Sequence, residues 1–452
     1  MRFSDMENAR VAILGMGREG QAVWRQLRRR FPGKSLTFFA ETEIDAGLLQ
    51  MLDPAIDHYC IGPLDLGGLE TFDILVRSAG ISPYRSELSK LRSSGPKFTS
   101  ASNLWFAENP DAKTICISGT MGKSTTAALT HHLLTQAGIK TCLSGNIGRP
   151  MLDCANEDTE WWVIELSSYQ ISDLEAEPDI VVLLNLSDEH VDWHGGAERY
   201  RSDKLKLAGL AGDGCVIANF ADKQLVEGLA QYSNVTWFNK EGAWRAREHG
   251  VIGSTGPYIP AVATLPGEHN MQNLAAALSV VDKLDLKIND LDEALSTFAG
   301  LPHRLQLIGE KDGIRYVNDS ISTTPVSVAA ALQTFGNEGV VLLLGGMDRG
   351  LDWSGFSTDL AGRTPYAIIT LPDNGPKIFD KLKRAGVEPE GGLHQSARLK
   401  DAVELAQKLV PAKGCILLSP GAPSFPHFRD FEDRGNQFKN IASIEKSASS
   451  AH

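Results

Sequence analysis

The sequence lacks any uninterrupted apolar run of roughly 18 residues, the length an α-helix needs to cross a bilayer. It also lacks an apolar amino-terminal stretch followed by small residues, because charged side chains occur from Arg2 onward. A secretory signal has such a stretch. These two absences predict a cytoplasmic protein that makes no membrane contact.

Cysteine and positive charge are also scarce. The six cysteines among 452 residues are scattered and form no C-x-x-C pair, which is typical of reduced thiols and disfavours disulfides or a zinc site. Lys and Arg number 44 against 56 Asp and Glu, for a formal charge of -12. Such a chain repels polyphosphate, so we expect no nucleic-acid partner and expect anionic ligands to be held by local donors.

The chain is long enough for about two to four domains. Short β-like runs alternate with amphipathic helical segments, a rhythm that predicts α/β domains built on parallel sheets with crossover helices. Expected strands lie at 10–14, 36–40, 74–78, 114–118, 161–166, 180–186, 314–318, 340–344, 367–370 and 415–419. Expected helices lie at 21–30, 125–136, 273–283 and 327–333.

A first glycine-rich loop, "GMGREG", contains Gly15, Gly17 and Gly20 and stands between an expected strand and an expected helix. Glu41 follows about twenty residues later, as in a dinucleotide-binding fingerprint. Such glycines let the backbone approach a pyrophosphate at a helix amino terminus. A tight strand-to-helix turn without a ligand explains the same pattern, because glycine also serves positive φ angles.

A second loop, "GTMGKSTT" at 119–126, has the outline of a phosphate-binding loop. Its amides can cradle phosphates, Lys123 can reach the β and γ oxygens, and the Ser124 hydroxyl can bind Mg²⁺. Two residues separate Gly119 from Gly122, where the common motif has four. A chance match remains the alternative for this shortened loop.

Three further residues are candidates for a metal site beside this loop. Glu165 ends the apolar run "WWVIEL", and His190 follows another apolar run in "NLSDEHVDWH", where His194 is a competing candidate. Lys204 lies in the helical pattern "ERYRSDKLKL". In isolation these residues read as a strand end, a satisfied polar histidine and a solvated cation. A desolvated Lys204 amine could instead react with CO₂ and become an anionic metal-binding carbamate.

Ten motifs in order resemble those of the Mur ligase family, over nearly the whole chain. They are "GTMGKSTT", "GNIG", "ELSSYQ", "NLSDEHVDWH", "YRSDK", "GEHNMQN", "LPHR", "VNDS", "LGGMDRG" and "SPGAPSFPHFRDFEDRGNQF". The set is most similar to the MurD-type branch, which adds glutamate to UDP-N-acetylmuramoyl-L-alanine in peptidoglycan synthesis. The resemblance implies a monomer of three domains: a Rossmann-like UDP-substrate domain at 1–109, a P-loop ATPase domain at 110–300 and a Rossmann-like amino-acid domain at 301–452.

The resemblance also implies a role for each matching residue. ATP would be bound by Gly119, Thr120, Gly122, Lys123, Ser124, Thr125, Asn270, Asn273, Arg304 and Asp319. Two Mg²⁺ ions would be held by Ser124, Glu165, His190 and Lys204 as a carbamate, with Lys123, Glu165, His190 and Lys204 as the catalytic set. The UDP substrate would contact Gly17, Arg18, Glu19, Ser78, Gly80 and Asn146. The incoming glutamate would contact Thr323, Arg349, Ser424 and Phe431.

The implied reaction uses ATP to convert the substrate carboxylate into an acyl phosphate, which the glutamate amine attacks, releasing ADP and phosphate. One stretch departs from the pattern: Ile321-Ser-Thr-Thr-Pro325 stands where the branch usually has Lys-Ala-Thr-Asn. The altered stretch resembles a subgroup that attaches L-glutamate, so we expect that enantiomer. Ordinary D-glutamate addition, another Mur or folylpolyglutamate-type ligase, and a non-catalytic nucleotide switch remain alternatives.

Overall fold

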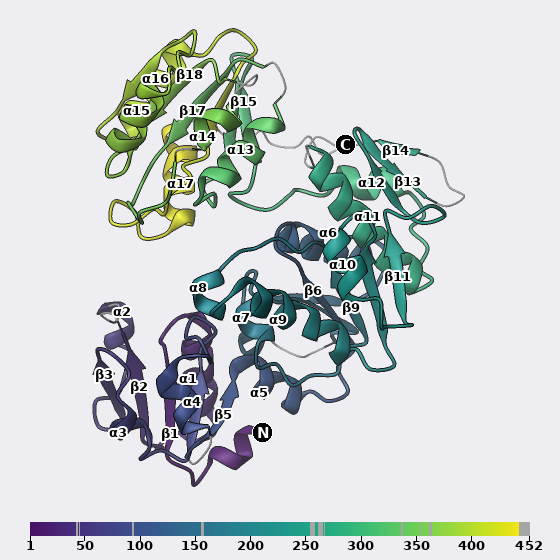
Figure 1. Cartoon of the computed structure of the whole chain (residues 1–452), viewed down its shortest axis with the longest axis vertical. Coiled ribbons are helices and arrows are strands. Elements are labelled where there is room, and N and C mark those ends of the chain that lie inside the picture. Colours follow the sequence, from purple (N-terminus) through teal and green to yellow (C-terminus); the bar gives the residue numbers. More distant parts are fainter. Residues whose placement is uncertain are drawn as a thin grey trace. The chain divides into compact units, whose positions relative to one another are not determined.

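The computed structural model describes residues 1–41, 44, 46–92, 95–154, 158–253, 258–260, 265, 267–335, 338–353, 355–360 and 364–442. Contacts divide the chain into two compact units. The first comprises Met1–Ala261 and Glu268–Phe298, and the second comprises Val262–Gly267 and Ala299–His452. In Figure 1 the first unit runs from purple to teal and the second from green to yellow.

The first unit begins with a parallel sheet in the order β3-β2-β1-β4-β5. Its strands are β1 (Val11–Leu14), β2 (Leu36–Ala40), β3 (Asp57–Ile61), β4 (Ile74–Arg77) and β5 (Lys97–Ser100). Its helices are α1 (Arg18–Arg30), α2 (Ala46–Leu49), α3 (Leu66–Leu69), α4 (Ser86–Leu91) and α5 (Ala101–Glu108), after the short turn η1 (Phe3–Met6). Strand order reverses between β1 and β4, and ligands of such sheets bind at the carboxyl ends of the strands where this happens.

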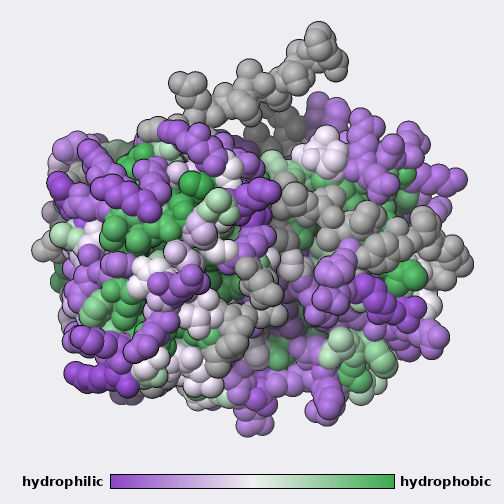
Figure 2. Space-filling view, turned by 90° about the horizontal axis from the view of Figure 1, so that it is seen from above, coloured by the Kyte–Doolittle hydropathy of each residue, from purple (hydrophilic) through white to green (hydrophobic). Residues whose placement is uncertain are grey.

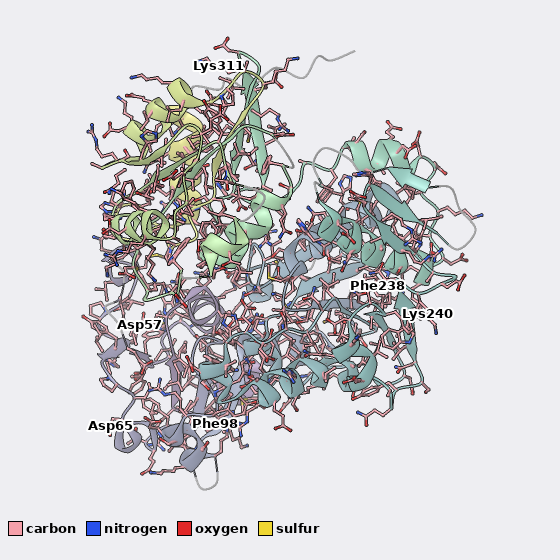
Figure 3. The ribbon with its side chains drawn as sticks, turned by 45° about the horizontal axis from the view of Figure 1, so that its top comes forward. Asp57, Asp65, Phe98, Phe238, Lys240 and Lys311 are labelled. Carbon is pink, nitrogen blue, oxygen red and sulfur yellow. The ribbon has the colours of Figure 1, made fainter. Side chains whose placement is uncertain are left out.

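Helix α1 is fastened to the edge strand β3 through one buried carboxylate. Asp57 is 4% exposed and accepts a hydrogen bond from Trp24 Nε1 at 3.2 Å, and it also pairs with Arg28 (Figure 3). A buried carboxylate needs such partners, because an unpaired charge away from water is costly. The pairing holds α1, and with it the glycine loop at its start, against this sheet.

The same unit holds a second parallel sheet in the order β11-β10-β9-β6-β8-β7. Its strands are β6 (Thr114–Ser118), β7 (Thr141–Gly145), β8 (Trp161–Glu165), β9 (Ile180–Leu183), β10 (Cys215–Asn219) and β11 (Val235–Phe238). The accompanying helices are α6 (Lys123–Gln136), η2 (Met151–Asp153), α7 (Ser168–Ile171), α8 (Val191–His194), α9 (Ala197–Leu210), α10 (Lys223–Gly228), α11 (Glu268–Lys283) and α12 (Leu291–Ser296). Strand β6 lies between β8 and β9, so the loops after all three meet at one edge.

A small antiparallel sheet in this unit was missed from the sequence. It consists of β12 (Arg245–Arg247), β13 (Gly250–Ile252) and β14 (Tyr258–Pro260). Phe238, which ends β11, and Lys240 precede it in the chain (Figure 3). Strands of three residues are too short for an alternating hydrophobic pattern to be recognisable.

The second unit is built on one sheet in the order β15-β16-β20-β17-β18-β19, parallel except for the antiparallel edge strand β15. Its strands are β15 (Gln306–Lys311), β16 (Ile314–Asn318), β17 (Val340–Leu344), β18 (Ala367–Thr370), β19 (Leu393–Gln395) and β20 (Cys415–Leu418). Its helices are α13 (Pro325–Gln333), α14 (Phe356–Asp359), α15 (Gly375–Arg384), α16 (Leu399–Leu409) and α17 (Phe431–Ile441). Pro325 begins α13, where its missing amide costs nothing.

The α/β prediction is confirmed, and strand positions are accurate to a residue or two except at β9, which ends at Leu183 where 186 was expected. The division at residues 109 and 300 stays a prediction. Hydrophilic residues predominate on the face shown in Figure 2, with hydrophobic residues in smaller groups between them. Among the described residues, no helix combines the length and hydrophobicity needed to span a membrane.

Candidate active site

The phosphate-type loop joins β6 to α6 as the sequence predicts. Gly119, Thr120 and Gly122 form the turn, and Lys123, Ser124 and Thr125 form the first helical turn. The 14-residue α6 therefore directs its unsatisfied amides and the positive end of its dipole into the loop. Lys123 Nζ donates to the Thr120 carbonyl at 2.8 Å, which keeps the ammonium at the mouth of the loop.

Helix α11 approaches this loop so closely that glycine is required at position 122. Gly122 has φ +83°, and a Cβ there would lie 2.2 Å from Asn273 Oδ1. Asn273 also accepts a hydrogen bond from Thr126 at 3.2 Å and donates one to Asn270 at 3.1 Å. The two predicted ATP-binding asparagines therefore lie beside the phosphate loop, buried and joined to each other.

We expect Gly122→Ala to weaken ATP binding at least tenfold more than Gly138→Ala does. Gly138, just past the other end of α6, has φ +86° but nothing within 4 Å of a built Cβ. Both variants carry the strain of a positive φ, on the order of 1 kcal/mol, so their difference isolates the collision with Asn273. Nucleotide titration and thermal unfolding of both variants would measure it; equal ATP affinities would contradict the expectation.

Glu165 ends β8, next to β6 in the sheet, and is 0% exposed. Its Oε1 accepts a hydrogen bond from Asn146 Nδ2 at 2.8 Å, whereas its buried Oε2 has no hydrogen-bond partner among the residues that the structure describes. A buried carboxylate oxygen without a partner is costly unless something binds it. The residues therefore fit a hard divalent cation such as Mg²⁺, which prefers oxygen ligands.

Lys204 lies in α9 and is 2% exposed, with Nζ donating to the Gly119 carbonyl at 2.6 Å. Burial lowers the pKa of this amine well below its ordinary value, and the charge of Lys123 lowers it further. The carboxylates of Glu189 and Glu165 act in the opposite direction on the pKa. The amine is thus desolvated and beside the phosphate loop, as the carbamate hypothesis requires.

The two histidines of "NLSDEHVDWH" differ in environment. His190, the N-cap of α8 with φ +55°, has a side chain that is 44% exposed and lies 3.7 Å from the Glu189 carboxylate. His194 is 0% exposed and hydrogen-bonds to Ser168 and Asp203, which excludes it as a competing metal ligand. In the part of the chain that the structure describes, no three His, Cys, Asp or Glu side chains are gathered as a metal site.

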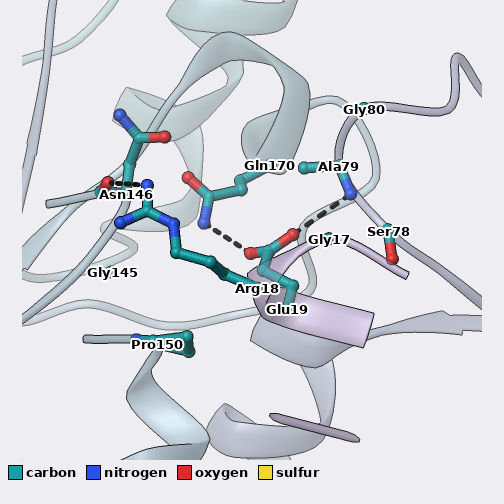
Figure 4. A pocket seen from close by; sticks show the side chains of 10 residues that line it. All are labelled: Gly17, Arg18, Glu19, Ser78, Ala79, Gly80, Gly145, Asn146, Pro150 and Gln170. Atoms are coloured by element: carbon teal, nitrogen blue, oxygen red, sulfur yellow. Dashed lines mark hydrogen bonds between the residues drawn. The ribbon is translucent and has the colours of Figure 1, made fainter. Parts of the chain in front are cut away.

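A pocket of about 160 Å³ lies where the loops of the two sheets of the first unit meet (Figure 4). All six residues predicted for the UDP substrate line it. They are Gly17, Arg18, Glu19, Ser78, Gly80 and Asn146. Ala79, which also lines the pocket, lies within the turn 78–80 that was predicted to bind the substrate, whereas Gly145, Pro150 and Gln170 were not predicted, although Gln170 closes the motif "ELSSYQ".

Arg18 and Glu19 have opposite functions in this pocket. Arg18 donates to the carbonyls of Gly148 and Asn146 at 3.2 and 3.4 Å, leaving a guanidinium at the pocket wall. Glu19 accepts from Ala79 N at 3.1 Å and from Gln170 Nε2 at 2.7 Å (Figure 4). A carboxylate repels a diphosphate, so Glu19 serves to tie the glycine loop to its neighbours, and Arg18 with the start of α1 supplies the positive potential.

Two further details concern the first loop. A Cβ on Gly20 would lie 2.1 Å from the Gly15 carbonyl oxygen, so the turn itself requires glycine there whatever it binds. Glu41 pairs with Arg85 at 2.8 Å and does not line the pocket. The geometry of the turn therefore accounts for the glycine at position 20. The acidic residue of the fingerprint, Glu41, forms an ion pair with Arg85 instead of contacting the pocket.

In the second unit the residues predicted for glutamate follow neighbouring strands. Thr323 follows β16, Arg349 follows β17, and Ser424 and Phe431 follow β20, so all four lie past the carboxyl ends of adjacent strands. Phe431 also accepts a hydrogen bond at its carbonyl from Ser320 Oγ at 2.8 Å. This edge is where parallel α/β sheets bind ligands.

Of the two residues predicted to contact ATP from the second unit, Asp319 is engaged within it, whereas Arg304 Nε is buried with no hydrogen-bond partner among the described residues. Asp319 accepts hydrogen bonds from Ser322 Oγ, from Ser419 Oγ at 2.8 Å and from Leu305 N at 3.0 Å. Burial raises the pKa of Asp319 to about 6, although those hydrogen bonds and the charge of Arg304 lower it. Asp319 thus organises the loop that carries Arg304.

Comparison with known proteins agrees with this site. Residues 117–281 match the model of the Mur ligase middle domain, and residues 303–421 match that of the Mur ligase glutamate ligase domain. The chain is 42% identical over 463 aligned positions to a UDP-N-acetylmuramoyl-L-alanine--L-glutamate ligase of Xanthomonas oryzae pv. oryzae, covering 100% of this chain and 98% of that protein. A protein of the same name from Xylella fastidiosa is 39% identical, covering 98% and 97%.

Solved structures share the fold at low sequence identity. MurC from Thermotoga maritima, a UDP-N-acetylmuramate-alanine ligase, superposes with a TM-score of 0.62 at 18% identity, covering 96% of this chain and 99% of that chain. The MurF ligase of the same organism, solved with ADP, gives 0.59 at 15% identity, covering 97% and 96%. The relatives' near-complete coverage, the two domain matches and the arrangement of the site agree with one another, and the chain belongs to the Mur ligase family.

Proposed function

We propose that this protein is an ATP-dependent amide ligase that adds glutamate to UDP-N-acetylmuramoyl-L-alanine, releasing ADP and phosphate. The names of relatives such as the Xanthomonas and Xylella proteins support the substrates. The phosphate loop, the buried carboxylate and the pocket support the chemistry. They belong to one compact unit, so a bound sugar nucleotide and a bound ATP would be neighbours.

One observation carries the proposal: Asn146 belongs to both sites. Its side-chain amide donates a hydrogen bond to Glu165 at 2.8 Å, and Asn146 is also one of the residues that line the pocket (Figure 4). A ligand in the pocket that contacts Asn146 is therefore one side chain away from the Glu165 carboxylate. This is the placement needed for a substrate carboxylate to attack the γ-phosphate of ATP.

The chain's own residues provide most of what that attack needs. Lys123 and the amides of α6 would bind the β and γ phosphates, and Lys204 and Glu165 would fix the far side of the loop. Asn146 would hold the substrate carboxylate in line. A carboxylate becomes a good acyl donor only once an oxygen is phosphorylated, after which the glutamate amine displaces phosphate and the amide bond forms.

Ser124, Glu165, His190 and Lys204 would hold Mg²⁺. When bound, Mg²⁺ neutralises part of the negative charge of the phosphates and the carboxylates. Reaction of the neutral Lys204 amine with CO₂ would form an N–C bond and release one proton, converting the amine into an anionic oxygen ligand. The depressed pKa of that amine favours the neutral form that reacts.

We propose L-glutamate as the amino acid, on the altered segment Ile321–Pro325 and on the relatives' names. In the structure this segment turns directly into α13, with Thr324 as the N-cap and Pro325 as the first helical residue. Inverting the α-carbon while the amine stays in line exchanges the positions of the α-carboxylate and the side chain. Their donors must move accordingly, and this loop lies at the edge where they would be.

We expect kcat/KM for L-glutamate to exceed that for D-glutamate at least about tenfold, a difference of roughly 1.4 kcal/mol in transition-state binding. The assay measures ADP and amide product from UDP-N-acetylmuramoyl-L-alanine, ATP and Mg²⁺ with each enantiomer in parallel. ATP turnover without amino acid is the control. Equal turnover of the two enantiomers, or a preference for D-glutamate, would refute the assignment.

The same assay separates the alternatives. Carboxyl oxygen labelled with ¹⁸O must appear in the released phosphate if an acyl phosphate forms. A folylpolyglutamate-type ligase would use a folate and leave the UDP substrate unchanged, and a nucleotide switch would make no amide. Unlabelled phosphate would overturn the mechanism.

A further inference from the structure

Three buried polar side chains of the first unit form a continuous hydrogen-bonded chain, which we name the relay: Ser168, His194 and Asp203. His194 Nδ1 lies 2.6 Å from Asp203 Oδ2, and its Nε2 lies 3.0 Å from Ser168 Oγ. The exposed fractions are 0% for His194, 3% for Ser168 and 7% for Asp203. These bonds are therefore shielded from competition by water.

The direction of each bond follows from the donor inventory. An ionised carboxylate only accepts, so the His194 Nδ1–H donates to Asp203, and Nε2 accepts from the Ser168 hydroxyl. The other oxygen of Asp203 accepts a hydrogen bond from the Tyr84 hydroxyl at 2.6 Å. A neutral imidazole satisfies every polar group in the relay.

The relay joins three segments that come from different parts of the sequence. Its serine is in α7, three residues after Glu165; its histidine ends α8, which begins after His190; its aspartate is in α9, directly before Lys204. Each segment thus carries one of the residues that our proposed function assigns to Mg²⁺. A hydrogen bond fixes both distance and direction, which apolar packing does not do as strictly.

We propose that His194 is a positioning residue, which holds the segments bearing Glu165, His190 and Lys204 in the register that divalent-cation binding requires. The inference rests on the proposed function for the role of those three residues. It assigns no contact between the relay and the ion. The relay acts by holding the three ligand-bearing segments in fixed positions relative to one another.

The relay also connects with the loop that lines the sugar-nucleotide pocket. Tyr84 belongs to the segment that follows β4, and so do Gly80 and Ser82. Trp193 Nε1 donates to the Gly80 carbonyl at 2.9 Å, and Ser82 Oγ donates to the Trp193 carbonyl at 2.6 Å. Gly80 lines the pocket (Figure 4). The position of α8 is therefore set from the pocket side as well as from α7 and α9.

The test compares cation binding with folding. Mn²⁺ would be titrated into the full-length protein with ADP present and followed by electron paramagnetic resonance, alongside the thermal midpoint and kcat. We expect His194→Gln and Asp203→Asn each to raise the Mn²⁺ dissociation constant by about 10-fold or more, as is typical when residues supporting metal ligands are changed. Tyr84→Phe, which removes one hydroxyl, should have a smaller effect in the same direction.

His132→Gln is the matched control. His132 is a half-buried histidine of α6 whose Nε2 bonds to the Ala294 carbonyl at 2.6 Å, outside the relay. This variant should keep the wild-type Mn²⁺ affinity even if its thermal midpoint falls. Should His194→Gln not fold, Tyr84→Phe and Ser168→Ala, each losing a single hydroxyl, still decide the matter.

Two results would overturn the proposal. One is relay variants that are folded and bind Mn²⁺ as tightly as wild type. The other is a loss of activity that merely follows the folded fraction. If wild type makes no amide product, the proposed function fails, while the Mn²⁺ affinities of wild type and variants still report on the relay by themselves.

Discussion

Replacing Glu165 by glutamine is expected to reduce kcat about 1000-fold, equivalent to roughly 4 kcal/mol of transition-state stabilisation. The substitution keeps the shape of the side chain, and the amide oxygen can still accept the hydrogen bond from Asn146. It removes the negative charge at a buried oxygen for which the described part of the chain provides no hydrogen-bond partner. An amide binds Mg²⁺ weakly, so the Mg²⁺ concentration for half-maximal rate should also rise.

The control for this variant is Glu160→Gln, just before the start of the same strand. Glu160 is exposed and accepts a hydrogen bond from the amide of Lys140 at 3.1 Å, so its neutralisation should leave kcat and the Mg²⁺ dependence unchanged. Both quantities come from initial rates of ADP release at varied Mg²⁺. A Glu165→Gln enzyme within about threefold of wild type at every Mg²⁺ concentration would remove this carboxylate from the mechanism.

The second large effect concerns Lys204. We expect Lys204→Ala to lower kcat at least 1000-fold, on the order of what loss of a buried charged group at an active site costs. The substitution removes a side chain that is 2% exposed and donates a hydrogen bond to the Gly119 carbonyl of the phosphate loop. If the residue acts as a carbamate, acetate or propionate entering the vacated space should restore part of the rate by supplying anionic oxygens. Added methylamine, a cation, should not.

Direct detection does not depend on turnover. Wild type equilibrated with ¹³C-bicarbonate should show a carbamate carbon resonance that is absent in Lys204→Ala and retained in Lys206→Ala. Lys206, half-buried on the same helix, donates to the Ser172 carbonyl at 3.3 Å and serves as the control. A wild-type spectrum without the resonance, together with no rescue by carboxylates, would show that Lys204 acts as an amine.

The spacing of glycines and the alternation of strands and helices predicted much of the fold. Strands such as β17 and β18 are near-continuous apolar runs with clear ends, because both faces of a parallel sheet are buried. The phosphate loop is local, so its six residues and the start of α6 follow from a single motif. The expected strands did not include β3, β5, β7, β10, β11, β15 or β19, nor the three-residue strands β12–β14.

The site was only partly predictable because its parts are distant in sequence. Asn146 was expected to contact the substrate, and nothing in its neighbourhood indicated that it would hydrogen-bond to Glu165. His190 was the predicted metal ligand and His194 the competing candidate, and only the structure showed that His190 is an exposed N-cap whereas His194 is buried and hydrogen-bonded to Ser168 and Asp203.

The sequence by itself determined the family, the α/β class and which residue types surround the phosphate loop, because these depend on short-range pattern and ordered motifs. Tertiary structure alone decided which groups are desolvated and which are paired. Within the described ranges it left Glu165 Oε2 without a hydrogen-bond partner, lowered the pKa of Lys204 by burial and placed His194 against a carboxylate. Burial and pairing are properties of atoms brought together from distant segments, and no local pattern specifies them.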